Sequence, residues 1–136
     1  MPFGPEPLGL AYFAAVKFAG YSMAGSFMKK RLPSSTPHVA VFGAARTVLG
    51  LAAGIGFALL MLAIGIDEHE WLFFLGLVPV RIAEWAATLW FFFGKNENLS
   101  GKALFQYSFG GMLWSFALDL PAIFALFSLP GGAWIC

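Results

Sequence analysis

The sequence predicts an all-α integral membrane protein: a four-transmembrane-helix antiparallel bundle with both termini on the outer side. First, the 136-residue chain is 60% hydrophobic and only 11% charged, whereas a soluble domain is about 25% charged. Its mean hydropathy is +0.78. Second, four apolar runs are long enough to cross a bilayer. Third, the basic residues fall unevenly among the connections between these runs. Residues 1–136 are expected to form a single transmembrane domain.

The predicted spans are residues 8–28, 39–66, 71–93 and 103–129. Each contains at least the roughly 20 residues that a helix needs to cross about 30 Å of hydrocarbon. The first is interpreted as a retained span and not as a signal peptide, because no Lys or Arg precedes it and Lys17 interrupts its apolar run. The short connection Asp67–Glu70 makes the second and third spans antiparallel neighbours.

The distribution of basic residues predicts the orientation. Five of the eight Lys and Arg residues lie in the first and third connections, and none lies in the second connection or at either terminus. Basic connections face the cytoplasm. Both termini are therefore expected outside, in a multi-pass protein of a prokaryotic cytoplasmic (inner) membrane. The five residues are Lys29, Lys30, Arg31, Lys95 and Lys102.

The other charged residues of interest fall inside the predicted spans. They are Lys17, Arg46, Arg81, Glu84 and Asp119. Each costs about 2.5–3.5 kcal/mol at the centre of a membrane helix, so five unpaired charges would cost on the order of 12–17 kcal/mol. Pairing between helices removes most of this cost, and we expect all five to face the interior.

Counting residues from the ends of each span places these charges at two depths. Lys17, Arg81 and Asp119 share an outer level, and Arg46 and Glu84 share a deeper one. The sequence therefore predicts that Glu84 lies opposite Arg46 and that Arg81 competes with Lys17 for Asp119. The five groups carry a net charge of +1 if all are ionised, so either Lys17 has lost its proton or an anion is bound.

Helical spacing places polar and small residues on the same interior faces. The third span carries Arg81, Glu84, Trp85 and Thr88 on one stripe. The predicted ligand-binding residues are Lys17, Tyr21, Arg46, Arg81, Glu84, Trp85, Ser115 and Asp119. Buried ion pairs that only specify which helices associate are the alternative interpretation.

Glycines and prolines add two further expectations. The spacing Gly50-x-x-x-Gly54-x-x-x-Ala58 indicates close helix packing, either within one chain or between two copies. Pro79 and Pro121 each remove a backbone hydrogen bond and are expected to bend their helices near the outer charge level. Such bends often accompany ligand sites in transporters, and a tolerated bend without a ligand is the alternative.

No metal, cofactor or nucleic acid is predicted. Asp67–Glu70 contains potential metal ligands, but four adjacent residues on a tight turn do not converge easily on one ion. The chain has no HExxH, GxSxG, CxxC, Walker or EF-hand pattern. It has one cysteine, Cys136. It has no Lys/Arg-rich helix facing water, which excludes a typical nucleic-acid-binding surface.

Three functions remain open. The first is binding or transport of an amphipathic, anionic-headed small molecule or membrane lipid in a charged pocket between helices, within a homo-oligomer. The second is a non-catalytic subunit or assembly factor that pairs its charges with other subunits of a membrane complex. The third is an intramembrane lipid- or isoprenoid-modifying enzyme with Glu84 or Asp119 as its catalytic acid or base.

Overall fold

The described part of the chain is helical apart from the turns and connections at the helix ends. The computed structural model describes residues 7–32, 38–65, 70–94, 99–121 and 124, and contains no β-strand within these ranges. Its helices are α1 (Pro7–Arg31), α2 (Val39–Ala63), α3 (Glu70–Leu89) and α4 (Gly101–Ala117), with one π-helical turn, η1 (Trp90–Gly94), continuing α3. The predicted all-α class is confirmed. Asp67–His69 and most of the chain beyond Pro121 lie outside the described residues.

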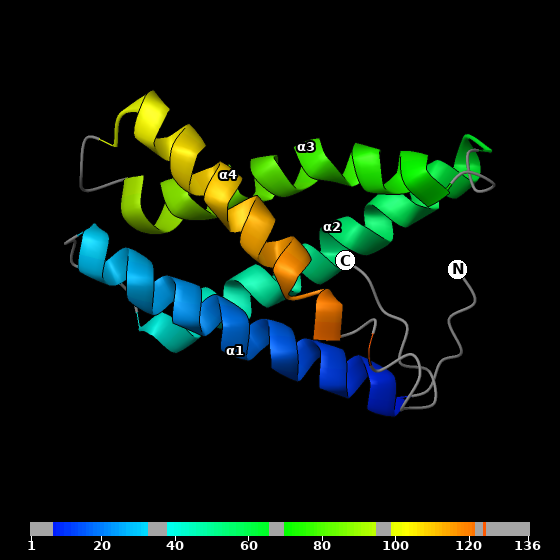
Figure 1. The fold of residues 1–136 in the computed structure, drawn as a ribbon, viewed down its shortest axis with the longest axis horizontal. Helices are drawn as coiled ribbons and strands as arrows, with labels where there is room; N and C mark the ends of the chain where they lie inside the picture. Colours follow the sequence, from blue (N-terminus) through cyan, green and yellow to red (C-terminus); the bar gives the residue numbers. More distant parts are fainter. Residues whose placement is uncertain (1–6, 33–37, 66–69, 95–98, 122–123, 125–136) are drawn as a thin grey trace.

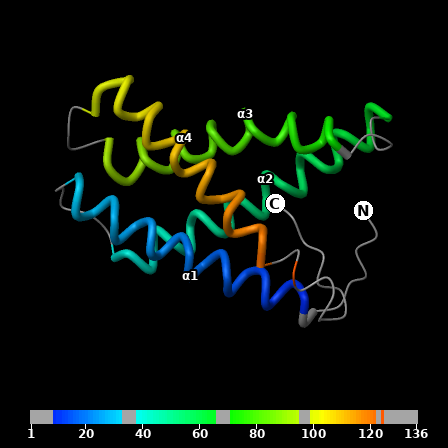
Figure 2. Tube along the Cα trace, in the orientation of Figure 1, coloured from blue at the N-terminus to red at the C-terminus, as the bar shows by residue number. Residues whose placement is uncertain are grey.

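Consecutive helices run in opposite directions (Figures 1 and 2). The end of α1, the start of α2, the end of η1 and the start of α4 lie toward one end of the molecule, on the left in Figure 1. α1 packs mainly along α2, and α3 packs mainly along α4, while α2 and α3 share a smaller contact. The structure is therefore two helical hairpins, α1–α2 and α3–α4.

Two helices are long and apolar enough to cross a membrane. They are residues Val39–Ala63 and Trp71–Gly94, with mean hydropathies of 1.8 and 1.5. Only 22% and 28% of their most apolar stretches are buried inside the protein. The central helix of a soluble protein would be mostly buried, so these exposed apolar surfaces favour membrane association. α1, which carries four basic residues, and the described 17 residues of α4 do not meet the same criterion.

α4 is interrupted within the predicted span 103–129. α4 stops at Ala117, a turn follows at Leu118 and Asp119, and the chain is helical again at Leu120 and Pro121. Pro121 contributes to this interruption, because it lacks the backbone N–H that would donate to the Ala117 carbonyl four residues earlier. The last turn tightens, with the Asp119 N–H donating to the Phe116 carbonyl at 3.0 Å. α3, in contrast, continues through Pro79, whose side chain is exposed.

Glycine allows α1 and α2 to approach closely at Gly43, which is not part of the predicted packing motif. A Cβ added at Gly43 would collide with the Ser22 hydroxyl and lie 3.1 Å from the backbone oxygen of Phe18. At Gly50 an added Cβ would meet, among the described residues, only the Arg46 guanidinium at 3.2 Å. Of the Gly50–Ala58 stripe, Gly54 is buried and Ala58 is exposed, so the stripe is only partly covered within one chain.

Aromatic side chains fill the core between the hairpins, toward the end of the molecule where α1 ends in Lys29, Lys30 and Arg31. We call this the basic end. Phe42 lies 5.8 Å from Phe93 and 6.1 Å from Trp85 between ring centroids. Tyr21 meets Trp85 edge to face at 5.7 Å. These rings come from three helices and η1, so they fix the relative positions of the elements that carry the candidate site.

Candidate functional site

Three of the predicted charges form one buried cluster. Asp119 receives Lys17 Nζ on Oδ1 at 2.5 Å and Arg81 Nη2 on Oδ2 at 2.6 Å. The three side chains are at most 5% exposed. Lys17 Nζ also donates to the Ser115 carbonyl at 3.1 Å. The prediction that Lys17 and Arg81 compete for Asp119 is therefore corrected, because the carboxylate has one oxygen for each of them.

The second predicted ion pair is confirmed. Arg46 Nη2 lies 2.7 Å from Glu84 Oε2, and the two side chains are 1% and 9% exposed. The pair joins α2 to α3, whereas the pair between Lys17 and Asp119 joins α1 to the turn after α4. Each pair therefore connects one hairpin with the other.

A hydrogen-bonded layer lies between the two ion clusters. The Ser115 hydroxyl accepts a hydrogen bond from Trp85 Nε1 at 2.9 Å and shares one with the Tyr21 hydroxyl at 3.1 Å. The Arg46 guanidinium lies 5.0 Å from the ring centroids of both Tyr21 and Trp85. All eight predicted site residues therefore belong to one continuous network.

Helical periodicity explains this layering. Lys17 and Tyr21 are four residues apart on α1, and Arg81 and Trp85 are four apart on α3. Ser115 and Asp119 have the same spacing at the end of α4. Residues four apart lie on one helix face, about one 5.4 Å turn from each other. Three helices thus each supply one charged residue and, one turn deeper, one hydrogen-bonding residue.

Aromatic faces accommodate part of the positive charge. The network contains three cationic and two anionic side chains. Nε and Nη1 of both Arg46 and Arg81 have no hydrogen-bond partner among the described residues. The Arg81 guanidinium instead lies 4.2 Å from the Phe116 ring centroid, and Arg46 faces Tyr21 and Trp85. Cation–π attraction stabilises such desolvated guanidinium groups.

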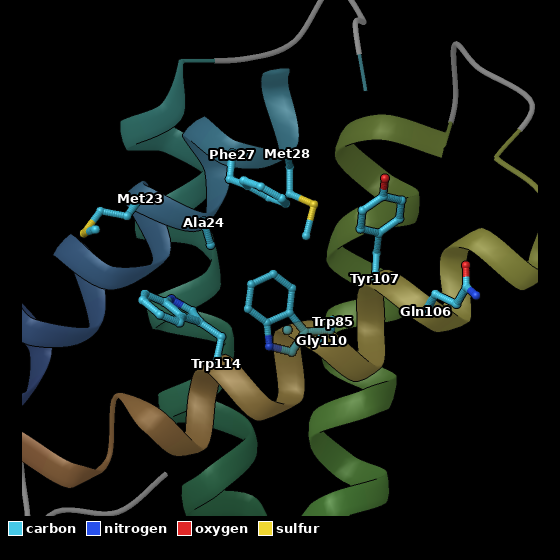
Figure 3. Close-up of a pocket in the computed structure, with 10 residues that line it drawn as sticks. Met23, Ala24, Phe27, Met28, Trp85, Gln106, Tyr107, Gly110 and Trp114 are labelled. Atoms are coloured by element: carbon cyan, nitrogen blue, oxygen red, sulfur yellow. The ribbon is translucent and has the colours of Figure 1, made fainter. Parts of the chain in front are cut away.

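An apolar crevice lies beside the network, between α1 and α4 (Figure 3). Its cavity volume is about 420 Å³, within the range of about 300–1,000 Å³ of ligand pockets. It is lined by Met23, Ala24, Phe27, Met28, Trp85, Gln106, Tyr107, Gly110, Gly111 and Trp114. Trp85 is the one predicted site residue that lines the crevice, so it belongs to both features.

The crevice exists because α1 and α4 meet at one end and separate toward the other (Figures 1 and 3). They are joined by the Lys17–Asp119 pair and by Trp114 Nε1, which donates to the Gly20 carbonyl at 3.0 Å. Leu118 fills the space beside Gly20. From Trp114 toward the start of α4 the two helices are apart, and the Trp85 ring lies between them against Gly111.

Nine of the ten residues that line the crevice were not among the predicted ligand-binding residues, although Ala24 and Gly111 were expected on interior helix faces. On α1 they are spaced at positions 23, 24, 27 and 28, and on α4 at 106, 107, 110, 111 and 114. This spacing is a helical stripe. Because these residues are mainly apolar or small, the stripe has the same composition as a lipid-facing surface, and the sequence holds no signal that separates the two.

The crevice carries no carboxylate. Glu84 and Asp119, the predicted acid or base candidates, both point into ion pairs and neither lines the crevice. Among the residues that the structure describes, no three His, Cys, Asp or Glu side chains gather at one point. No protein-family model, curated protein or solved structure matches the chain.

Proposed function

We propose that the protein crosses a prokaryotic cytoplasmic membrane four times and binds or transports an amphipathic molecule with an anionic head. The apolar part of this molecule enters the crevice between α1 and α4. The observation that carries the proposal is the crevice itself, about 420 Å³ with a lining of Met, Phe, Trp and Gly. An apolar cavity of this size with a few polar groups suits a small ligand.

Exposed apolar side chains on every helix support the membrane location. Soluble monomers rarely expose apolar patches larger than a few hundred Å². Here large apolar residues are exposed along each helix, among them Phe18 and Phe27, Val48 and Leu59, Trp71 and Leu75, and Phe105 and Leu113. In this proposal these residues contact acyl chains, and the crevice opens sideways into the bilayer.

The ion network has a supporting role in this function. Ion pairs buried in a membrane fix which helices associate. The network joins the two hairpins and, through Ser115, holds the indole of Trp85 in place. Of the eight residues predicted to bind ligand, Trp85 contacts the ligand directly, and the other seven position it and close the end of the crevice.

The geometry favours this function over the other two. An enzyme using Glu84 or Asp119 needs a carboxylate in contact with its substrate, and both carboxylates are instead held in ion pairs. A complex subunit that pairs its charges with other chains needs charges without an internal counter-ion, whereas here Glu84 pairs with Arg46 and Asp119 is shared by Lys17 and Arg81.

Filling the crevice tests the proposal. Gly110 lines the crevice and has no atom within 4 Å of an added Cβ, so Gly110→Leu places a side chain in the cavity. Gly56→Leu is the matched control, because Gly56 is also an exposed helix glycine with open space but lies on α2, away from the crevice. Both variants are reconstituted in phosphatidylcholine nanodiscs and titrated with hexadecyl phosphate.

We expect hexadecyl phosphate to raise the Tm of the unmodified protein and of Gly56→Leu. A ligand at 100 times its Kd stabilises the bound state by about 2.7 kcal/mol. The same addition should leave the Tm of Gly110→Leu unchanged. The proposal is wrong if hexadecyl phosphate shifts none of the three proteins, or if it shifts Gly110→Leu as much as the control. Circular dichroism before titration verifies that both variants are folded.

A further inference from the structure

Basic residues stand at the open end of the crevice. α1 ends in Lys29, Lys30 and Arg31, and Lys102 lies in the first turn of α4. All four are exposed. The Arg31 guanidinium lies 5.4 Å from the ring centroid of Phe27, which lines the crevice. The positive charge of Arg31 therefore lies close to the aromatic ring of a residue that lines the crevice.

Helical position shows which of these residues face the crevice. Arg31 follows Phe27 by four residues, and Lys102 precedes Gln106 by four, so each lies one turn beyond a lining residue on the same face. Lys29 is two residues from Arg31, about 200° around the helix, and therefore lies on the opposite face of α1. Lys30 follows Phe27 by three and lies at the edge of the same face. We define the mouth by Arg31 and Lys102, each four positions from a lining residue on its own helix.

The dimensions match one leaflet of a bilayer. Trp114, at the closed end, and Lys102, at the mouth, are 12 residues apart (114 − 102), which is about 18 Å along a helix. Half the hydrocarbon thickness of a bilayer is about 15 Å. A molecule whose head lies at the membrane surface would therefore extend its chain to about the level of the ion network.

We propose that the crevice holds one acyl chain of an anionic glycerophospholipid from the leaflet at the basic end, with its phosphate between Arg31 and Lys102. This rests on the proposed function and specifies its ligand. The buried arginines are not the head-binding residues, because Arg46 and Arg81 are engaged by Glu84 and Asp119. The exposed basic residues complement the negative charge that anionic lipids give to the cytoplasmic leaflet.

The lining suits a hydrocarbon chain. Met23 and Met28 are flexible and polarisable, and such side chains adapt to chains of variable conformation. Gln106 is exposed between Lys102 and the apolar lining, where its amide can donate to a lipid ester group. The order from mouth to closed end is therefore cationic, polar and apolar, the order of groups along a phospholipid.

Photolabelling with matched lipids tests this proposal. The full chain is placed in phosphatidylcholine nanodiscs that contain a trace of phosphatidylglycerol or phosphatidylcholine, each carrying the same acyl-chain diazirine. After irradiation, mass spectrometry locates the labelled residues. We expect the phosphatidylglycerol probe to label positions 23–28 and 106–114 more strongly than the phosphatidylcholine probe.

Charge-neutral variants identify the head-binding residues. Each basic residue near a membrane surface raises the affinity for an anionic lipid by about five-fold. Arg31→Gln and Lys102→Gln should therefore each lower phosphatidylglycerol labelling of the crevice by about that factor. Lys29→Gln removes the same charge from the same end of α1 but from the opposite face, and should leave crevice labelling unchanged. All three residues are exposed, so folding should be preserved.

Each other result contradicts the proposal in a distinct way. Equal labelling of the crevice by both lipids would disprove recognition of the anionic head, while chain binding in the crevice would stand. A Lys29→Gln effect as large as that of Arg31→Gln would show general surface attraction and disprove the assigned mouth. Absence of label from the crevice with both probes would overturn this inference, while the proposed function would stand or fall on the separate hexadecyl phosphate titration of Gly110→Leu.

Discussion

Two adjacent glycines on α4 have different surroundings. An added Cβ at Gly111 would collide with the Trp85 ring, whereas one at Gly110 would meet nothing within 4 Å. The Trp85 indole is held by its hydrogen bond to Ser115 and by its packing against Tyr21 and Phe42. The indole therefore has little room to retreat from a methyl group at position 111.

We expect Gly111→Ala to lower the free energy of unfolding by about 1–3 kcal/mol, the usual cost of overpacking a core. Gly110→Ala should be neutral or stabilising, because alanine is the better helix former and the space is open. Thermal unfolding of the two variants in the same nanodiscs measures the difference. Equal stabilities would mean that Trp85 does not pack on Gly111.

The pair between Arg46 and Glu84 predicts a charge-swap result. Arg46→Glu and Glu84→Arg each place like charges together in a buried site, and each should cost about 3–5 kcal/mol. The double variant restores opposite charges at the same positions and should recover part of this loss. The free energies of unfolding of the unmodified protein, the two single variants and the double variant give the coupling energy between positions 46 and 84. Additive losses would contradict the contact of 2.7 Å.

The ion network was largely predictable from the sequence. Charges inside membrane spans must pair, and helical spacing together with depth left few partners for each one. The sharing of Asp119 was not predictable, because it depends on the turn that follows α4 and aims one carboxylate at both Lys17 and Arg81. The crevice was not predictable either, since apolar residues lining a cavity have the composition of those facing lipid.

At the level of the helices, Gly43 sets the spacing between α1 and α2. Its neighbours on α1 are the backbone oxygen of Phe18 and the backbone nitrogen of Ser22, both 3.1 Å from an added Cβ. Backbone atoms of a helix cannot retreat separately, so a methyl group here must push the two helices apart. Gly50, two turns further along α2, faces only a flexible Arg46 side chain among the described residues.

We expect Gly43→Ala to destabilise the protein by about 1–3 kcal/mol through this separation. Gly50→Ala, the control on the same helix, should change stability much less, because the Arg46 guanidinium is the end of a long side chain. Thermal unfolding again compares the two variants. A larger loss for Gly50→Ala would indicate that the Gly50 stripe makes a contact between copies of the chain.

Helix boundaries were predicted best where hydrophobicity changes abruptly. The first three helices cover their expected spans with small differences at the ends, since basic or acidic residues flank each apolar run. The fourth was expected over 103–129, but α4 ends at Ala117. There the sequence stays apolar while Pro121 interrupts the backbone hydrogen bonds. Hydrophobicity alone therefore does not reveal the interruption at Leu118 and Asp119, after which the chain is helical again at Leu120, and most of 122–129 lies outside the described residues.

For the whole molecule, the proposed orientation predicts the accessibility of Cys136. On intact cells, a membrane-impermeant maleimide should label Cys136, because the positive-inside rule places the C-terminus outside. Lys30→Cys in a Cys136→Ser background should be labelled only after permeabilisation. Attachment of the maleimide is detected as a shift of the protein band on a gel, with and without permeabilisation of the cells. Labelling in the reverse pattern would place the basic connections outside and contradict the proposed topology.

The division of buried charge between the hairpins has a consequence for biosynthesis. The first hairpin carries Lys17 and Arg46, a charge of +2, and the second carries Arg81, Glu84 and Asp119, a charge of 1 − 2 = −1. The ribosome completes α1 and α2 before either acid has been translated. The nascent hairpin therefore holds two cations with no internal counter-ion until the second hairpin arrives. In the proposed four-span topology the carboxylates of the second hairpin supply these counter-ions, so a chain truncated after α2 should be retained by the insertion machinery or degraded.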